Sequence, residues 1–228
     1  RAAARLGPFG QNLHLRAEVG STSDEIIRLA DEGAPHGTVV VAGAQTAGRG
    51  RHGNRWFSPA GSGLYLSVLL REPVAPLLTL VTGVILAETL RRVAALTVEL
   101  EWPNDVVVML DGQRRKVAGI LAESTPDPGG PRVVLGIGIN LSDGAWPPEL
   151  AGQAASVSGL TGAAVDADRL LVELLAALAA RVEQLSRGDT AELRARWSRL
   201  APSSDGTRVR WSGPDGLAEG TTAGIDVD

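Results

Sequence analysis

Runs of apolar residues predict the strands of a β-sheet in the first two thirds of the chain. Continuous apolar runs predict buried strands at 38–42, 64–70 and 132–141. Alternation of apolar and polar residues predicts a half-buried strand at 98–102. Two further runs, at 106–110 and 117–122, flank Asp111-Gly112, which is typical of a two-residue hairpin turn. Several hairpin-linked strands together predict a mixed, largely antiparallel sheet.

Longer apolar stretches with a helical period predict the flanking helices. The expected helices lie at 77–95, 168–185 and 190–200. A shorter helix follows a capping box in which Thr22 is the N-cap and Glu25 the third helical residue. Gly33 and Gly188 are the expected C-terminal stops of this helix and of the helix at 168–185. Helices combined with this sheet place the chain in the α/β class.

The composition changes after residue 200. Gly, Asp and Thr turns alternate there with short β segments such as 208–211. We therefore expect one domain over 1–200 and the start of a small β-domain over 203–228.

Composition and charge exclude several classes of protein. Apolar residues make up 44% of the 228 residues, which is typical of a globular chain, and no cysteine is present for a disulfide or a thiolate metal site. The net charge of −4 disfavours a general nucleic-acid or polybasic membrane binder. No apolar run reaches the roughly 18 residues of a transmembrane helix. The first ten residues contain no signal-peptide core, so a cytoplasmic location is expected.

The basic residues are unequally distributed between the two types. Twenty-one of the 22 are arginine, and Lys116 is the single lysine. A lysine supplies a compact point charge, whereas an arginine is a planar fork, so a tight anion site is one reason to retain lysine here. Chance survival on a surface hairpin is the other interpretation, and composition does not choose between them.

The long loop at 46–63 contains Gly48-Arg49-Gly50-Arg51-His52-Gly53, which formally matches a dinucleotide-binding fingerprint. That interpretation fails because no helix begins at the third glycine. Glycine N–H groups and forked arginine side chains instead indicate an anion-binding loop. Residues 33–71 contain no Asp or Glu, which favours a local positive field. The alternative is a solvated turn whose arginines aid solubility.

Two further segments have residues of chemical interest. Asn104 and Asp105 follow a proline at the corner between two strands, where they either face a cleft or satisfy their own turn. A period of two places Lys116, Ala118 and Ile120 on one face of their strand.

Glycines inside predicted strands indicate a close approach to the backbone. Gly119 lies in one strand, and Gly136 and Gly138 lie in the next. Because such glycines weaken a strand, something is expected to pack against the bare backbone, either a ligand or another part of the sheet. No histidines are spaced as metal ligands, and no metal site is predicted.

Six segments together resemble one known family. They are GSTS at 20–23, QTAGRGRHGNRWFSP at 45–59, LYLSVLLR at 64–71, WPNDV at 102–106, KVAGILAE at 116–123 and VVLGIGINL at 133–141. In this order and spacing they resemble the catalytic domain of the biotin protein ligases, over about the first 140 residues. The rest of the chain resembles the closing helices of that family and the beginning of its C-terminal SH3-like barrel. The resemblance implies a class II synthetase-like fold.

The resemblance also implies an activity. Such an enzyme activates biotin with ATP and Mg²⁺ as biotinyl-5′-AMP, then transfers biotin to a lysine of the biotin carboxyl carrier domain of a carboxylase. About 20 residues precede GSTS, too few for a helix-turn-helix, so no DNA partner is expected. No membrane partner is expected either, and the chain would be a monomer or a homodimer. The alternatives are a lipoate or octanoate ligase or transferase on the same fold, and a non-catalytic biotin-binding module.

Residue roles follow from the same resemblance. The catalytic residues would be Arg49, Asp105 and Lys116. The biotin site would comprise Ser21, Thr22, Ser23, Gln45, Gly48, Arg49, Gly50, Arg51, Lys116, Gly119, Gly136 and Gly138. The ATP site would comprise Arg49, Arg51, Trp56, Asn104, Asp105, Lys116 and Asn140.

Three positions depart from the family pattern. Ser23 stands where asparagine is common, and Asn54 and Glu101 stand where basic residues are frequent. Alternation predicts that Glu101 points to solvent.

Overall fold

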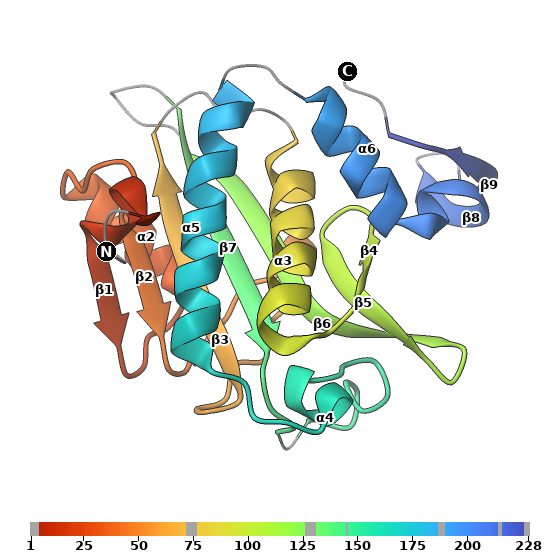
Figure 1. The fold of residues 1–228 in the computed structure, drawn as a ribbon, viewed down its shortest axis with the longest axis horizontal. Coiled ribbons are helices and arrows are strands. Elements are labelled where there is room, and N and C mark those ends of the chain that lie inside the picture. The colour runs from red at the N-terminus through yellow and green to blue at the C-terminus, as the bar shows by residue number, and fades with distance from the viewer. Residues whose placement is uncertain are drawn as a thin grey trace.

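The chain folds around one seven-stranded sheet (Figure 1). The computed structural model describes residues 5–71, 77–125, 131–144, 146–186, 190–213 and 216–225. The strands are β1 (Leu13–Arg16), β2 (Val39–Ala42), β3 (Gly63–Leu70), β4 (Glu99–Glu101), β5 (Asp105–Leu110), β6 (Gln113–Thr125) and β7 (Arg132–Asn140). They lie in the order β1-β2-β3-β7-β6-β5-β4, with only β1 and β2 parallel. The expected mixed, largely antiparallel sheet is confirmed.

Helices cover both faces of this sheet. They are α2 (Thr22–Asp31), α3 (Leu78–Ala94), α4 (Val157–Thr161), α5 (Ala167–Ser186) and α6 (Ala191–Leu200), with short 3-10 turns at Gly7–Gly10, Arg51–Gly53 and Pro202–Ser204. In Figure 1, α3 and α5 lie side by side across the front of the sheet. Alternate residues of β3, such as Leu66 and Val68, join α3 and α5 in the main core. The neighbouring Leu69 packs instead with Ile26 of α2, in a second cluster.

The predicted helices at 77–95 and 190–200 are confirmed to within one residue at each end, and the helix at 168–185 begins one residue earlier and ends one later. The N-cap of α2 is Ser21 rather than Thr22, because the Ser21 hydroxyl accepts a hydrogen bond from the backbone N–H of Ser23 at 3.2 Å. Gly33 follows the helix with a φ of 90°, as a C-terminal stop requires. The other expected stop, Gly188, lies outside the described residues.

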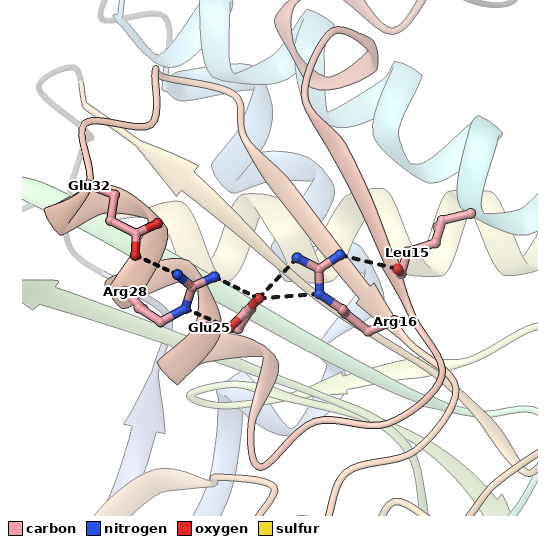
Figure 2. Close-up of polar contacts among 5 residues, drawn as sticks. All are labelled: Leu15, Arg16, Glu25, Arg28 and Glu32. Atoms are coloured by element: carbon pink, nitrogen blue, oxygen red, sulfur yellow. Dashed lines mark hydrogen bonds and ion pairs between the residues drawn. The ribbon is translucent and has the colours of Figure 1, made fainter.

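Ion pairs fix α2 against the edge strand. Figure 2 shows Glu25 between Arg16 of β1 and Arg28 of its own helix, at N–O distances of 3.1 and 3.0 Å. Arg28 also pairs with Glu32 one turn further on. The network is half exposed, so each pair contributes little to the stability of the fold. The network ties the first turn of α2 to strand β1 and so fixes the position of the helix beside the sheet.

A separate antiparallel pair follows α6 and supplies the expected short β segment. Strands β8 (Asp205–Gly213) and β9 (Gly216–Ala223) form it, leaving Trp211 and Leu217 more than half exposed. A domain boundary near residue 200 stays a prediction. No helix within the described part of the chain is long and apolar enough to cross a bilayer.

Candidate active site

A cavity of about 310 Å³ opens on the face of the sheet that carries α2. Small residues make this possible, because Ser67 of β3 and Gly136 of β7 are paired neighbours on that face. A Cβ atom added at Gly136 would lie 3.2 Å from the Ser23 hydroxyl. The walls are the start of α2, the loop at 49–56, the turn between β4 and β5, and the middle of β6 and β7. Segments far apart in the sequence therefore meet around one space.

One end of the cavity is neutral and polar. The Gln45 side-chain carbonyl accepts hydrogen bonds from the backbone N–H and the hydroxyl of Thr22, at 2.8 and 3.1 Å. Ser67 donates to the Thr22 hydroxyl at 2.8 Å and lies 3.1 Å from the Ser23 hydroxyl. These side chains orient one another, so the site presents prearranged donors and acceptors to an uncharged polar group.

The other end is charged. The Lys116 ammonium lies 2.6 Å from Asp105 and 5.2 Å from the centre of the Trp56 ring. Arg51 donates to the side-chain oxygen of Asn104 at 3.3 Å. Asn104 in turn donates to the backbone carbonyl of residue 120 at 2.8 Å, which ties the β4–β5 turn to β6. This end can therefore hold an anion.

A β-bulge aims Lys116 into the cavity. Val107 pairs with Lys116 and Val106 pairs with Ala118, so Val117 is an extra residue in β6. Both Val117 and Ala118 are buried in the core. The prediction that Lys116 shares a face with Ala118 and Ile120 is therefore wrong, because a bulge breaks the period of two.

The Trp56 indole packs directly on the backbone of β6 and β7, at glycines that carry no side chain. A Cβ atom added at Gly138 would lie 2.4 Å from the indole, and one at Gly119 would lie 2.9 Å from it. A side chain other than hydrogen at either position would therefore displace the ring. Close packing at these glycines was expected from the sequence, and in the structure the Trp56 indole takes the room that the resemblance assigns to biotin. The indole N–H is buried and has no hydrogen-bond partner within the described residues.

The glycine- and arginine-rich loop is itself a small hairpin. The N–H of Gly50 donates to the carbonyl of Asn54 at 2.8 Å, and the N–H of Trp56 donates to that of Gly48 at 2.9 Å. At its tip, His52 and Gly53 have left-handed φ angles of 56° and 77°. We call residues 48–56 the Arg hairpin.

Arg49 of the Arg hairpin forms ion pairs with Asp24 of α2 and Glu123 of β6. Burial lowers the pKa of Arg49, but hydrogen bonds to Glu123 and Asp24 outweigh it and the pKa is raised. Neither acid was identified as a candidate from the sequence. Their only signal was indirect: a loop without acidic neighbours needs carboxylates from elsewhere.

Most residues expected in the site do line the first cavity. They are Ser21, Thr22, Ser23, Gln45, Arg49, Gly50, Arg51, Trp56, Asn104, Asp105, Lys116, Gly119, Gly136 and Gly138. Gly48 does not line this cavity; it begins the Arg hairpin, where a Cβ atom would come 2.5 Å from the Trp56 carbonyl oxygen at the other end of the hairpin.

Asn140 belongs to an adjoining cavity of about 540 Å³, which Trp56, Asp105 and Lys116 also line. Its amide donates to the backbone carbonyls of Lys116 and Ala155, both at 3.2 Å. Asn140 thus fixes the backbone beside the ammonium.

Glu101 differs from expectation. It is half-buried, lines the adjoining cavity and lies 3.5 Å from Arg114. The ion pair with Arg114 explains why it is not simply solvated. Among the described residues, no three His, Cys, Asp or Glu side chains cluster as metal ligands.

Similarities in sequence and in fold to known proteins point to one family. The profile of the Biotin/lipoate A/B protein ligase family matches residues 21–140. This match covers more than half of the chain, so the chain belongs to the Biotin/lipoate A/B protein ligase family.

Relatives within that family carry more specific names. A biotin–[acetyl-CoA-carboxylase] ligase of Mycobacterium tuberculosis is 35% identical over 222 residues, covering 92% of this chain and 78% of the relative. The bifunctional ligase/repressor BirA of Bacillus spizizenii is 31% identical, and the match covers 96% of this chain and 68% of the relative. A solved structure of the Aquifex aeolicus biotin protein ligase in complex with biotin and ATP has a TM-score of 0.82 at 30% identity, covering 95% of this chain and 89% of that one.

Proposed function

We propose that this chain is an ATP-dependent biotin protein ligase, which activates biotin and transfers it to a carboxylase carrier domain. The observation that carries the proposal is the single cavity that joins a neutral polar end to a cationic end. Biotin has an uncharged ureido ring at one end and a carboxylate at the other. Its ring suits the side chains around Gln45 and Thr22, and its carboxylate suits Lys116 and Arg51.

The first step is the attack of the biotin carboxylate on the α-phosphorus of ATP. A bond forms between a carboxylate oxygen and phosphorus, while the bond from phosphorus to the β-phosphate oxygen breaks and pyrophosphate leaves. Both reactants are anions, so they repel one another until cations lie beside them. Lys116 and Arg51 are the groups proposed to do this, and both stabilise the charge that develops in the transition state.

In the second step a lysine amine of the carrier domain attacks the acyl carbon of biotinyl-5′-AMP. A carbon–nitrogen bond forms, the bond to the phosphate oxygen breaks, AMP leaves and the amine gives up a proton. The mixed anhydride also reacts with water, so the site must exclude solvent while it waits for the carrier. The Arg hairpin and Trp56 are proposed to supply that cover.

The adjoining cavity with Asn140 and Trp146 is proposed to hold the nucleotide. Magnesium enters as part of the substrate MgATP and prefers carboxylate and phosphate oxygens. Asp105 presents such a carboxylate beside both cavities and fits this role. A cytoplasmic location and a monomer or homodimer remain expectations.

Biotin-dependent exchange of pyrophosphate into ATP tests the proposal. The exchange should require biotin and should not proceed with lipoate or octanoate alone. Exchange supported only by lipoate or octanoate would establish the alternative ligase. Calorimetry separates the non-catalytic module, since weak biotin binding that ATP does not tighten would favour it.

A further inference from the structure

The Arg hairpin is attached to the rest of the protein by a small number of side chains. Trp56 packs on Gly119 and Gly138, and Arg51 contacts Asn104. Arg55 donates to the backbone carbonyl of Thr46 at 2.8 Å. The Arg49 guanidinium joins the hairpin to two other elements, α2 and β6, by ion pairs. The Arg hairpin lines two cavities. These side-chain contacts therefore decide whether the hairpin stays over the site.

The two arginines at the start of the Arg hairpin have different electrostatic surroundings. Arg49 has carboxylate partners on two of its nitrogens, Asp24 on one side and Glu123 on the other. Two carboxylates more than cancel one positive charge, so Arg49 adds little attraction for an anion. The contact of Arg51 is with the neutral Asn104. Arg51 therefore keeps its charge for a ligand.

Position along β6 separates Arg49 from the reacting groups. Glu123 follows Lys116 by seven residues in that strand, and a rise of about 3.3 Å per residue puts their Cα atoms on the order of 20 Å apart. Asp24 lies in the first turn of α2, directly after Ser23. The Arg49 guanidinium thus lies at the neutral end of the cavity, away from the Lys116 ammonium.

The acidic partners are suited to holding a cation permanently. The Glu123 side chain is only 28% exposed, and its second carboxylate oxygen is buried without a hydrogen-bond partner within the described residues. A half-buried carboxylate is costly to leave unpaired, so Glu123 favours the position in which Arg49 covers it. Asp24 is more exposed, at 56%, and contributes the weaker of the two contacts.

We propose that Asp24 and Glu123 are positioning residues that act through Arg49 to hold the Arg hairpin closed over the bound adenylate. This proposal rests on the proposed function and assigns Arg49 to anchoring rather than to the reacting carboxylate. Loss of the anchor lets the hairpin open, which speeds the escape of the intermediate. The chemistry at Lys116 is left in place.

Two measurements on the full chain test the anchor. The first is limited trypsin cleavage after Arg51 and Arg55 without any added ligand, which reports opening of the hairpin directly. The second is the rate at which radiolabelled biotinyl-5′-AMP leaves the protein after dilution into unlabelled biotin. Glu123→Gln should raise both rates by about tenfold, because hydrogen bonds to charged groups contribute that order of stabilisation. Asp24→Asn should raise them by a smaller factor.

Glu32→Gln is the matched control. Glu32 pairs with an arginine of the same helix but lies at its far end, away from the hairpin. It should leave both rates unchanged. A second comparison separates anchoring from a general loss of packing: in an Arg49→Gln background, Glu123→Gln should add nothing further to either rate.

The outcomes are distinct. Equal cleavage and release for Glu123→Gln and Glu32→Gln would overturn the anchor, as would a full additional effect in the Arg49→Gln background. If the unmodified chain forms no adenylate, the proposed function fails, while trypsin cleavage still decides whether Glu123 anchors the hairpin. Should Glu123→Gln not fold, the exposed Asp24→Asn provides the same comparison.

Discussion

Replacing Lys116 by methionine tests the charged end of the cavity, because it removes the ammonium and keeps an unbranched side chain of similar length. The ammonium lies 2.6 Å from Asp105 and above the Trp56 ring, so both neighbours remain after the change. Lys116 is also the only lysine in the chain, so no other lysine can substitute for it.

The size of the effect follows from the charges. Two unit charges 4 Å apart interact by about 4 kcal/mol at an effective dielectric constant of 20. That energy corresponds to roughly 1,000-fold in rate, since each 1.36 kcal/mol is tenfold. Asp105 already offsets part of the ammonium charge, which lowers the expectation to about 100-fold. We therefore expect Lys116→Met to slow adenylate formation by about 100-fold or more.

Biotin-dependent ATP–pyrophosphate exchange measures this step apart from transfer to the carrier. A Lys116→Met/Asp105→Asn double variant shows whether an unpaired Asp105 carboxylate causes the loss, and thermal unfolding confirms that each variant is folded. Lys116→Arg should also be impaired, because the lysine side chain fits within 3.2 Å of where a Cβ atom at Gly119 would stand, too close for a planar guanidinium. A folded Lys116→Met protein with exchange within about threefold of normal would refute the reasoning.

Three further changes examine other parts of the site and its support. Gly138→Ala should displace the Trp56 indole, cost about 1–3 kcal/mol in urea unfolding and shift the tryptophan fluorescence, whereas an unchanged protein would show that the ring is not packed there. Arg51→Gln should raise the KM for ATP by about tenfold if Arg51 makes the proposed charge-assisted contact to phosphate, and an unchanged KM contradicts that role. The pKa of Glu25 is lowered chiefly by its hydrogen bond to Arg28, so its stabilisation is present above the unfolded-state pKa of about 4.3 and is lost as the pH falls through the lower folded-state value. Glu25→Gln should therefore destabilise the protein in urea at pH 7 and have no effect near pH 2.

Apolar patterning was sufficient for most of the fold and insufficient at its edge. Strands β3 and β7 are buried across most of their length, so their continuous apolar sequences identify them. Strand β1 escaped prediction because it is four residues long, sits at the sheet edge and leaves Leu15 67% exposed. Strand β1 pairs with β2, and helix α2 lies between the two strands in the sequence. No local sequence pattern reveals such a pairing. The N-cap of α2 was misplaced by one residue because Ser21, Thr22 and Ser23 can all cap a helix.

The site was predictable from the sequence where the residue type itself limits what can pack beside it. Glycines within predicted strands indicated that another group packs against the strand backbone. The structure identifies this group as the Trp56 indole. The direction of Lys116 was not predictable, since the bulge at Val117 depends on pairing with β5. Glu123 was hidden for a similar reason: its role depends on Arg49, which is 74 residues away in sequence.

The distribution of charge around the Arg hairpin explains why a net acidic chain can still bind anions. Lys116 and Arg49 each form ion pairs with carboxylates. These pairs fix the position of both side chains and offset much of their positive charge. Arg51 is held by the amide of Asn104, which fixes its position and leaves its charge intact. A neutral partner thus provides orientation without competing with the ligand, and this difference predicts that Asn104→Asp would weaken nucleotide binding more than removal of the amide by Asn104→Ala.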